Sequence, residues 1–404
     1  DTLLSRTPPS VDPESISLAG CGVDIHLVTE TYPPDVNGVS TTLGRLVDSL
    51  RERGHRVVIT CPRGSRPRDL EEGSEVPGLS MPFYREVRVG LPRKRAFLEE
   101  WGEDPPDLVH VATEGPLGSS ALAAAEALSL PVTSSLHTNF HTYARSYRVG
   151  WLTAPVMRYL RRFHNRTATT FIPTRQQATE LAPMGFERLE VLGRGVDTHL
   201  FHPRRRDPSL RRAWGVGDGT PVLLYVGRLA AEKNLDLLVA AVKRAREIDP
   251  ATVAVIVGDG PERVRLERAL PEAVFAGVRR GKDLARHYAS ADGFVFPSRT
   301  ETFGNVLLEA MASGLTCLSF DYAAGRLLIE PGVSGWLAPL DDEPRFLDLV
   351  PALLTADGAR RERARQTACR HGWGEVIDAF ESRLSSVANG ARPAMTCIQE
   401  EGSV

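Results

Sequence analysis

The chain has 404 residues, a formal net charge of −2 and 42% hydrophobic residues. This length exceeds one ordinary domain core, so two or three domains are expected, and a near-neutral charge excludes a general nucleic-acid-binding protein. The scattered cysteines Cys21, Cys61, Cys317, Cys369 and Cys397 form no paired metal or redox spacing and favour a reducing compartment. No apolar run approaches the roughly 18 to 20 residues of a membrane span, and no signal-peptide pattern opens the sequence. We expect a cytoplasmic protein that is soluble or peripheral on the inner face of the plasma membrane.

Short apolar runs alternate with amphipathic segments, which predicts parallel strands joined by crossover helices. The expected strands cover 23–28, 57–61, 108–112, 132–136 and 169–172, and then 222–226, 252–257, 273–275, 293–296 and 316–320. Between the two series, the basic stretch His202-Pro-Arg-Arg-Arg-Asp-Pro-Ser predicts a linker. The fold class is therefore α/β, with two doubly wound, Rossmann-like domains whose ligands bind in the cleft between them.

The expected boundaries follow from these series. Residues 1–20 and 389–404 lack sustained periodicity and are expected to be flexible tails, while 21–203 and 204–371 form the two Rossmann-like domains. Residues 372–388 have apolar side chains at helical spacing. This last helix can close the second domain or cross back onto the first.

The first expected strand leads into Asn37-Gly38-Val39, where a helix begins that Gly54 should end. Without a side chain, Gly38 lets a phosphate or sugar approach the backbone closely, and it is a candidate donor-binding residue. The strand over 132–136 ends in His137-Thr-Asn-Phe-His141, which puts two imidazoles at the cleft. Zinc can use a four-residue His spacing, but no third ligand is nearby and no D-x-D pair occurs, so no metal is expected. We favour a function for His137 and leave a structural role open for His141.

An acid-free segment between Glu126 and Glu180 is rich in arginine. The helix expected over 155–165 would turn Val156, Tyr159, Leu160 and Phe163 inward and its arginines outward. Such a surface, with the basic cluster at 85–95, can bind anionic lipid headgroups, and a solvated basic face is the equal alternative. The arginines of the segment are Arg145, Arg148, Arg158, Arg161, Arg162, Arg166 and Arg175.

The strand over 222–226 is followed by Gly227-Arg228 and then by Lys233-Asn234. The planar fork of Arg228 and the point charge of Lys233 can together neutralise a diphosphate, although two surface cations at a helix start are the plainer interpretation. The next strand closes in Gly258-Asp259-Gly260-Pro261. A tight turn explains most of this motif and leaves Asp259 as a candidate.

The most informative motif is Glu301-Thr-Phe303-Gly304-Asn305-Val-Leu-Leu-Glu309, which spans a turn and the start of a helix. Free backbone N–H groups and the positive end of a helix dipole suit a phosphate, and the carboxylates of Glu301 and Glu309 suit sugar hydroxyls. A phosphate between two polyols describes a nucleotide sugar.

Together these residues resemble the retaining family 4 glycosyltransferases of GT-B fold, over a match from Val23 to about Leu384. Closer still, the segments starting at His137, Tyr159 and Gly193-Arg194 resemble the bacterial GDP-mannose-dependent α-mannosyltransferases and lipid glycosyltransferases. One departure is Asp321-Tyr-Ala-Ala-Gly-Arg326, where many relatives have Gly-Gly followed by an acid. This turn borders the donor sugar in the family.

The resemblance implies the roles of the candidates. In the family, residues matching Arg228 and Lys233 bind the diphosphate, Glu309 holds the ribose, Glu301 holds the sugar and His137 lies beside it. The loop of Gly38 closes over the donor, Arg279 lines the base pocket, and the last helix crosses back. The candidate catalytic residues are His137, Arg228, Lys233 and Glu301, and the candidate donor-binding residues are Gly38, Arg228, Lys233, Asp259, Arg279, Phe303, Gly304, Asn305 and Glu309.

The expected reaction is the transfer of a hexose, with mannose from GDP-mannose favoured, to a glycolipid or other membrane-associated acceptor, without metal or other cofactor. A UDP-glucose-dependent or other UDP-sugar-dependent transferase with a lipid or soluble glycan acceptor is the first alternative. A non-catalytic protein that binds nucleotide sugars is the second. The expected partners are a nucleotide sugar, a lipid or glycan acceptor and an anionic membrane surface, and no nucleic acid.

Overall fold

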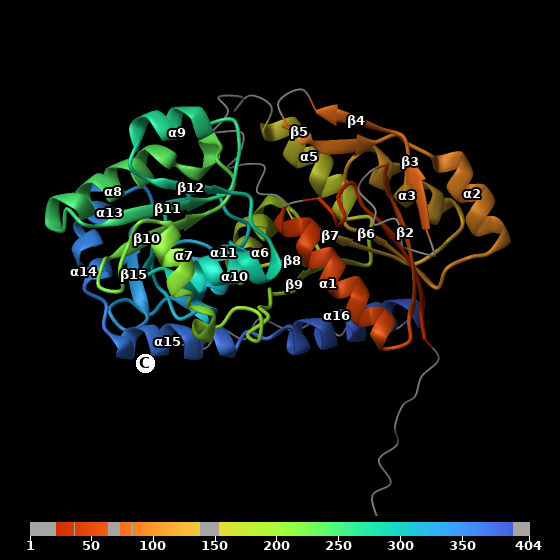
Figure 1. Ribbon diagram of the computed structural model, residues 1–404. Coiled ribbons are helices and arrows are strands. Elements are labelled where there is room, and N and C mark those ends of the chain that lie inside the picture. The colour runs from red at the N-terminus through yellow and green to blue at the C-terminus, as the bar shows by residue number, and fades with distance from the viewer. Residues whose placement is uncertain (1–21, 36, 64–72, 82–83, 138–152, 391–404) are drawn as a thin grey trace, which may run out of the picture.

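A computed structural model describes residues 22–35, 37–63, 73–81, 84–137 and 153–390. Most of the two expected tails, together with His141, Arg145 and Arg148, lies outside the described residues. The chain forms two sheets, each covered by helices, that lie side by side (Figure 1). This confirms the expected α/β fold with two Rossmann-like halves.

The first sheet has the order β3-β2-β1-β6-β7-β8-β9, and each neighbouring pair is parallel. Helices α1 and α16 cover one face, and α2 and α3 cover the other. Its strands are β1 (Asp24–Val28), β2 (Arg56–Pro62), β3 (Gly73–Val76), β6 (Leu108–Val111), β7 (Val132–Ser135), β8 (Thr169–Ile172) and β9 (Leu189–Val191). The other elements of this half are the hairpin of β4 (Gly78–Met81) and β5 (Tyr84–Gly90), helices α1 (Gly38–Glu52), α2 (Lys94–Glu103), α3 (Pro116–Ala127), α5 (Thr153–His164) and α6 (Arg175–Leu181), and the 3₁₀ turn η2 (Ala182–Met184).

The second sheet has the order β12-β11-β10-β13-β14-β15 and is also parallel. All five residues of β10 are buried, because helices pack on both faces of this central strand. Its strands are β10 (Val222–Val226), β11 (Val253–Val257), β12 (Val274–Gly277), β13 (Gly293–Phe296), β14 (Thr316–Phe320) and β15 (Gly335–Ala338). Its helices are α7 (Pro208–Ala213), α8 (Leu235–Ile248), α9 (Arg263–Ala269), α10 (Gly281–Ser290), α11 (Asn305–Ala312), α12 (Ala324–Leu328), α13 (Glu343–Asp348), α14 (Val350–Leu354) and α15 (Gly358–Cys369), with 3₁₀ turns η3 (Pro203–Arg205) and η4 (Ala231–Lys233). The last helix, α16 (Trp373–Ala388), packs on the first sheet instead.

Every expected strand is present within one or two residues of its expected ends. The sequence analysis did not predict β3, β4, β5, β9 or β15, because all of these except β5 are only three or four residues long and show no clear strand periodicity. The linker region is ordered around η3 and α7, whose N-cap Asp207 accepts hydrogen bonds from the first turn.

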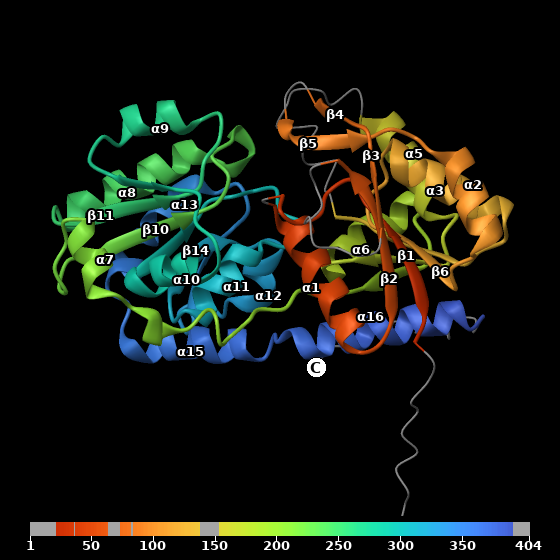
Figure 2. The ribbon, with the colours of Figure 1, turned by 45° about the vertical axis from the view of Figure 1, so that its right-hand side comes forward.

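Helix α16 leaves the second half of the chain and lies along the first (Figures 1 and 2). Phe380 is 1% exposed and packs its ring against His110 and Phe171 of the first sheet. At the surface, Arg53 pairs with Asp378 at 2.6 Å, and His55 contacts Glu381 at 2.9 Å. Two connections therefore join the halves, the linker before α7 and the segment between α15 and α16.

Helix α5 differs in one respect from its expectation. Leu160 and Phe163 are buried and Arg158, Arg161 and Arg162 are exposed, as expected. Tyr159, expected to face inward, is 45% exposed, and its hydroxyl lies 2.5 Å from the Ser119 hydroxyl. The phenol needs a polar partner, which the surface supplies more readily than the core.

Candidate functional site

The carboxyl ends of the two sheets meet at one cleft. A Cβ atom on Gly38, at the start of α1, would lie 3.7 Å from the Asn305 side chain at the start of α11. On the same edge, the Ala323 N–H donates to the Gln176 side chain of α6 over 3.3 Å. The glycine loop of the first half thus lies directly against the Glu301–Glu309 motif of the second.

Lys233 and Glu301 form the charged centre of this edge. The Lys233 Nζ atom lies 2.6 Å from Glu301 Oε1, and their side chains are 17% and 14% exposed. Lys233 ends the 3₁₀ turn η4, after which Asn234 takes a left-handed backbone (φ +53°) and α8 begins. The two residues are brought together from the ends of β10 and β13. A diphosphate can therefore meet the ammonium group while sugar hydroxyls meet the carboxylate.

Arg228 lies beside this pair. Its guanidinium is 3.9 Å from the Glu232 carboxylate, which is almost fully buried and whose backbone carbonyl accepts from the Thr300 hydroxyl. The turn containing Asp259 packs on the same loop, because the Leu229 N–H donates to the Asp259 carbonyl over 2.9 Å. The Asp259 carboxylate itself is half-exposed and bonds Arg263 and the Gly260 N–H.

Gly304 is the N-cap residue of helix α11, and no side chain caps this helix. Gly304 has φ +103°, a conformation that L side chains rarely adopt, and an added Cβ would lie 3.1 Å from the Phe296 ring. The Leu307 N–H already donates to the Gly304 carbonyl over 3.0 Å, so the N–H groups of Asn305 and Val306 are the ones that an anion can meet. Phe303 is 3% exposed, and its carbonyl accepts from the Ala324 N–H over 3.0 Å, so it packs beneath this turn and its side chain is not open to a ligand.

Glu309 lies one turn into α11, where the Tyr288 hydroxyl donates to its Oε2 over 3.0 Å. Burial raises the pKa of Glu309 to about 7, and the hydrogen bond from Tyr288 opposes that rise. A carboxyl group in this state gains most from a ligand that supplies hydroxyl donors. Arg279 lies at the rim, 3.3 Å from the Asp283 carboxylate, with both side chains partly exposed.

His137 lies at the carboxyl end of β7. Its Nδ1 atom is 3.0 Å from the guanidinium of Arg194, which is 7% exposed and also donates to the carbonyls of Leu192 and Gly193. Burial and the charge of Arg194 lower the pKa of His137 well below its ordinary value. Among the described residues, the contacts of His137 lie within the first half, whereas Lys233, Glu301, Gly304 and Glu309 gather in the second.

Several residues of this edge were missed at the sequence level. Gln176 and Tyr288 carry no local signal, since each contacts this edge through a partner far along the chain. Glu232 was given no role either, and Arg194 was noted only as part of the Gly193-Arg194 motif. Two further carboxyl groups, Glu30 after β1 and Glu114 after β6, have pKa values raised to about 7 by burial. Glu30 accepts from the Leu117 N–H at the start of α3 over 3.1 Å.

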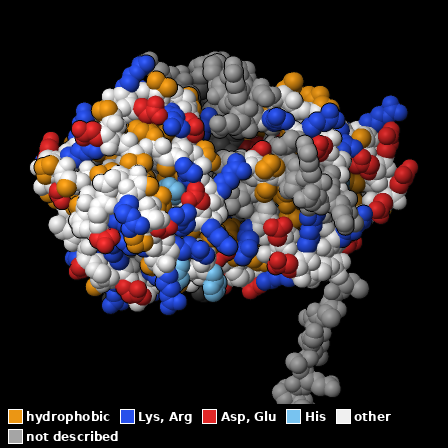
Figure 3. Space-filling view, viewed as in Figure 1, with side chains coloured by type: hydrophobic (Ala, Val, Ile, Leu, Met, Phe, Trp, Pro, Cys, Tyr) orange, Lys and Arg blue, Asp and Glu red, His pale blue; other side chains and the backbone are white. Residues whose placement is uncertain are grey.

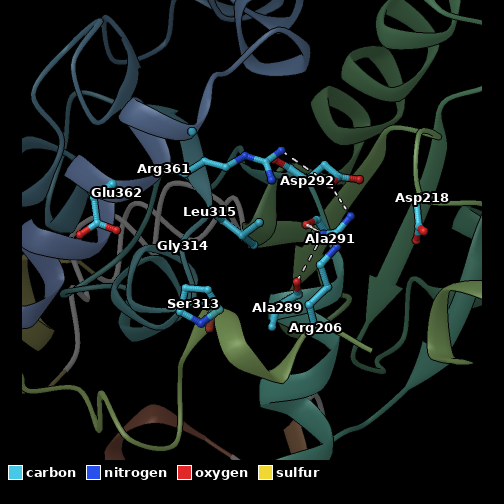
Figure 4. Close-up of a pocket in the computed structure, with 12 residues that line it drawn as sticks. Arg206, Asp218, Ala289, Ala291, Asp292, Ser313, Gly314, Leu315, Arg361 and Glu362 are labelled. Carbon is cyan, nitrogen blue, oxygen red and sulfur yellow. Dashed lines mark hydrogen bonds and ion pairs between the residues drawn. The ribbon is translucent and has the colours of Figure 1, made fainter. Parts of the chain in front are cut away.

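Within the described ranges, no group of three His, Cys, Asp or Glu side chains could hold a metal ion. A hollow of about 460 Å³ lies elsewhere, at the amino ends of β13 and β14 (Figure 4). There Arg206 and Arg361 point toward Asp292, with distances of 3.0 Å and 3.6 Å. This cluster ties the linker and α15 to the second sheet and is remote from the carboxyl edge.

Comparison with known families now adds to this geometry. The profile of Glycosyltransferase Family 4 matches residues 36–200, and that of Glycosyl transferases group 1 matches residues 220–356. A GDP-mannose-dependent alpha-mannosyltransferase from Mycolicibacterium smegmatis is 37% identical over 374 residues, covering 90% of this chain and 97% of the relative. The chain belongs to the family 4 glycosyltransferases.

Further relatives and solved structures are similar to this glycosyltransferase. The Mycobacterium tuberculosis protein of the same description is 35% identical, covering 91% of this chain and 97% of the relative. An alpha-monoglucosyldiacylglycerol synthase from Streptococcus pneumoniae is 28% identical, covering 72% of this chain and 69% of the relative. Among solved structures, HepE from Anabaena in complex with UDP and glucose has a TM-score of 0.73 at 18% identity, covering 90% of this chain and 100% of HepE. The fold is therefore GT-B.

The described residues include no helix that is both long and apolar enough to cross a membrane.

Proposed function

We propose that this glycosyltransferase moves mannose from GDP-mannose to a hydroxyl of a membrane glycolipid, with retention at the anomeric carbon and without a metal ion. The observation that carries the proposal is the contact between Lys233 and Glu301 beside the uncapped start of α11. It supplies a cation, a carboxylate and free N–H groups in the arrangement that a nucleotide sugar requires.

Charge develops on the diphosphate as the bond to the anomeric carbon breaks. Arg228, Lys233 and the N–H groups of α11 are fixed positive groups that can stabilise this charge, which is the work that a divalent metal does elsewhere. Glu301 and Glu309 would hold hydroxyls of the sugar and the ribose. Neither would then attack carbon, so retention is assigned to front-face transfer in which the departing phosphate takes the acceptor proton.

The names of the two GDP-mannose-dependent relatives support mannose and guanine. The name of the glucosyldiacylglycerol synthase supports a lipid acceptor. The exposed arginines Arg158, Arg161 and Arg162 on α5 suit an anionic lipid surface. A UDP-sugar donor is the second candidate, because Asp283, the carboxylate that could accept from guanine N1 and its amino group, already pairs with Arg279.

Calorimetric titration with GDP-mannose, UDP-glucose, GDP and UDP, in the presence of EDTA, tests the donor and the metal. Binding of the guanine pair alone is expected, and binding of the uridine pair alone would replace the donor. If no nucleotide binds until manganese is added, the metal-free proposal is wrong.

Lys233→Ala tests the site. Transfer should fall by about 100-fold or more, as when one preorganised donor to a developing anion is removed. Lys243→Ala, which removes an exposed lysine of α8, is the matched control and should retain full activity. Near-normal transfer by Lys233→Ala would remove this lysine from the reaction.

A further inference from the structure

The contact between Arg194 and His137 determines which ring nitrogen carries hydrogen. Arg194 NH2 lies 3.0 Å from His137 Nδ1. A guanidinium has only N–H donors and keeps its proton in proteins, so Nδ1 must be the acceptor. The single hydrogen of the neutral ring is therefore on Nε2.

The surroundings keep the ring neutral. Burial is the main cause of the lowered pKa of His137, followed by the charge of Arg194. The neighbouring histidines are held in polar networks: His110 contacts the hydroxyls of Thr133 and Ser135, and His164 contacts the Ser134 hydroxyl. Burial lowers the pKa of both to about 3, so they are neutral near neutral pH, and burial and Arg194 are what oppose a second proton on His137.

The other nitrogen of the ring is poised for a ligand. Nε2 of His137 is buried and has no hydrogen-bond partner among the residues that the structure describes. A buried N–H without a partner is destabilising, so such a group is kept where a substrate can satisfy it. His137 follows β7 at the carboxyl edge of the first sheet, the edge that faces the donor site.

We propose that Arg194 is a positioning residue that fixes His137 as a hydrogen-bond donor from Nε2 toward an oxygen of the sugar nucleotide, and that His137 is not a general base. The proposal rests on the proposed function, since it assumes that a sugar nucleotide occupies the cleft.

The tautomer of His137 determines where the proton of the acceptor hydroxyl goes. With Nδ1 occupied by Arg194 and Nε2 already carrying hydrogen, the ring has no lone pair for the acceptor proton. As the bond between the acceptor oxygen and the anomeric carbon forms, and the bond from that carbon to the phosphate oxygen breaks, the acceptor proton passes to the departing phosphate. The products are the glycoside and the nucleoside diphosphate.

The tautomer is tested first, without substrate, so that the result is independent of the proposed function. Nitrogen NMR of the protein labelled with ¹⁵N-histidine reports which ring nitrogen is protonated, and comparison with His137→Gln identifies the signals of His137. We expect hydrogen on Nε2 in the wild type and in Arg194→Lys, which keeps a donor. Arg194→Met should release Nδ1 and give a mixture of tautomers. Hydrogen on Nδ1 in the wild type would overturn the proposal.

Kinetics test the role. The side-chain amide of His137→Gln can donate but cannot act as a base, so it should stay within about tenfold of wild-type kcat, whereas His137→Ala should lose about 100-fold. Equal losses in the two variants would overturn the donor assignment. If the wild type transfers no sugar at all, the proposed function fails, and the NMR result on the tautomer still stands.

Arg194→Met also removes bonds to the carbonyls of Leu192 and Gly193, so its stability needs a control. Arg188→Met removes another arginine of the first half that also donates to a backbone carbonyl, that of Thr167 over 2.9 Å; Arg188 is more exposed than Arg194 and does not contact His137. We expect Arg194→Met to lose at least tenfold in kcat, to be partly rescued in Arg194→Lys, and Arg188→Met to keep its activity. An Arg194→Met variant as active as Arg188→Met would contradict the positioning role.

Discussion

Glu309 makes donor binding depend on pH near neutrality. Its pKa of about 7 means that half of the free enzyme carries a protonated carboxyl at that pH. In the proposed complex, ribose hydroxyls donate to the carboxylate, so donor binding should favour loss of the proton. Affinity for GDP-mannose should then rise about tenfold from about pH 6 to about pH 8 and level off. Calorimetry across this range measures it. The sugar nucleotide is the right probe because its diphosphate, esterified at both ends, does not titrate there.

Two variants assign the effect to this carboxyl. Glu309→Gln should bind more weakly and without this pH dependence, even though Glu30 and Glu114 also titrate near pH 7. Tyr288→Phe removes the hydrogen bond that favours the carboxylate, so its affinity should rise at a higher pH than in the wild type. A pH dependence that survives in Glu309→Gln would assign the titration to another group.

The turn that departs from the family's Gly-Gly has a strained backbone at Ala323. Its backbone has φ +48° and ψ −124°, a conformation that costs a residue with a Cβ atom about 1 to 3 kcal/mol. Ala323→Gly should relieve this strain and raise the free energy of unfolding by about 1 kcal/mol, after the greater freedom of glycine in the unfolded chain is subtracted. Urea unfolding measures the difference. Ala324→Gly, one residue later inside α12, should instead destabilise the protein, and a loss in both variants would refute the strain.

At the scale of elements, Asp292 joins three segments. Its carboxylate accepts from Arg211 at 2.9 Å and from Arg206 at 3.0 Å, and the Arg361 guanidinium is 3.6 Å away (Figure 4). The Arg211 side chain is 1% exposed, so removing its partner leaves a buried charge with carbonyl contacts only. Asp292→Asn should lower the free energy of unfolding by about 3 kcal/mol, measured by urea unfolding.

An exposed ion pair is the matched control for this prediction. Asp236 pairs with Arg265 at 2.5 Å, but the two side chains are 83% and 47% exposed. Water screens such a pair, so Asp236→Asn should change the unfolding free energy by less than about 1 kcal/mol. Equal effects of the two substitutions would show that burial of Arg211 is not what matters.

At the scale of the whole molecule, α16 makes the end of the chain part of the first domain's core. Phe380 is packed between α16 and the first sheet, and truncating a buried Phe costs about 3 to 5 kcal/mol. Phe380→Ala should therefore raise hydrogen exchange in α1 and β6 while α8 stays protected. Phe346→Ala, which empties an equally buried site against Phe320 in the second half, should show the reverse pattern. Loss of protection in α8 for Phe380→Ala would mean that the halves unfold as one unit.

The distribution of charge over the surface is also a property of the whole molecule. Basic and acidic side chains are interspersed over the face seen in Figure 3, in keeping with the net charge of −2. Any attraction to anionic lipid must then be local, as on α5, where Arg158, Arg161 and Arg162 are exposed. Arg166, just after this helix, is already paired with Glu126.

The sequence by itself determined the strands, the crossover pattern and the turn-to-helix motif of Glu301 and Glu309. These features depend on apolar periodicity, glycine positions and caps within a few residues, which are local in the chain. Periodicity could not reveal polar strands such as Gly73–Val76, since their pairing depends on a neighbour already in the sheet.

Only the tertiary structure decided the long-range contacts. Lys233 meets Glu301 across 68 positions, His137 meets Arg194 across 57, and Arg53 meets Asp378 across 325. Each pair forms because parallel strands bring their carboxyl ends to one edge, or because a helix crosses between domains. Neither arrangement produces a recognisable pattern in the residues nearby in sequence. For that reason the residue types of the site could be named from the chain alone, whereas the tautomer of His137, the raised pKa of Glu309 and the strain at Ala323 could not.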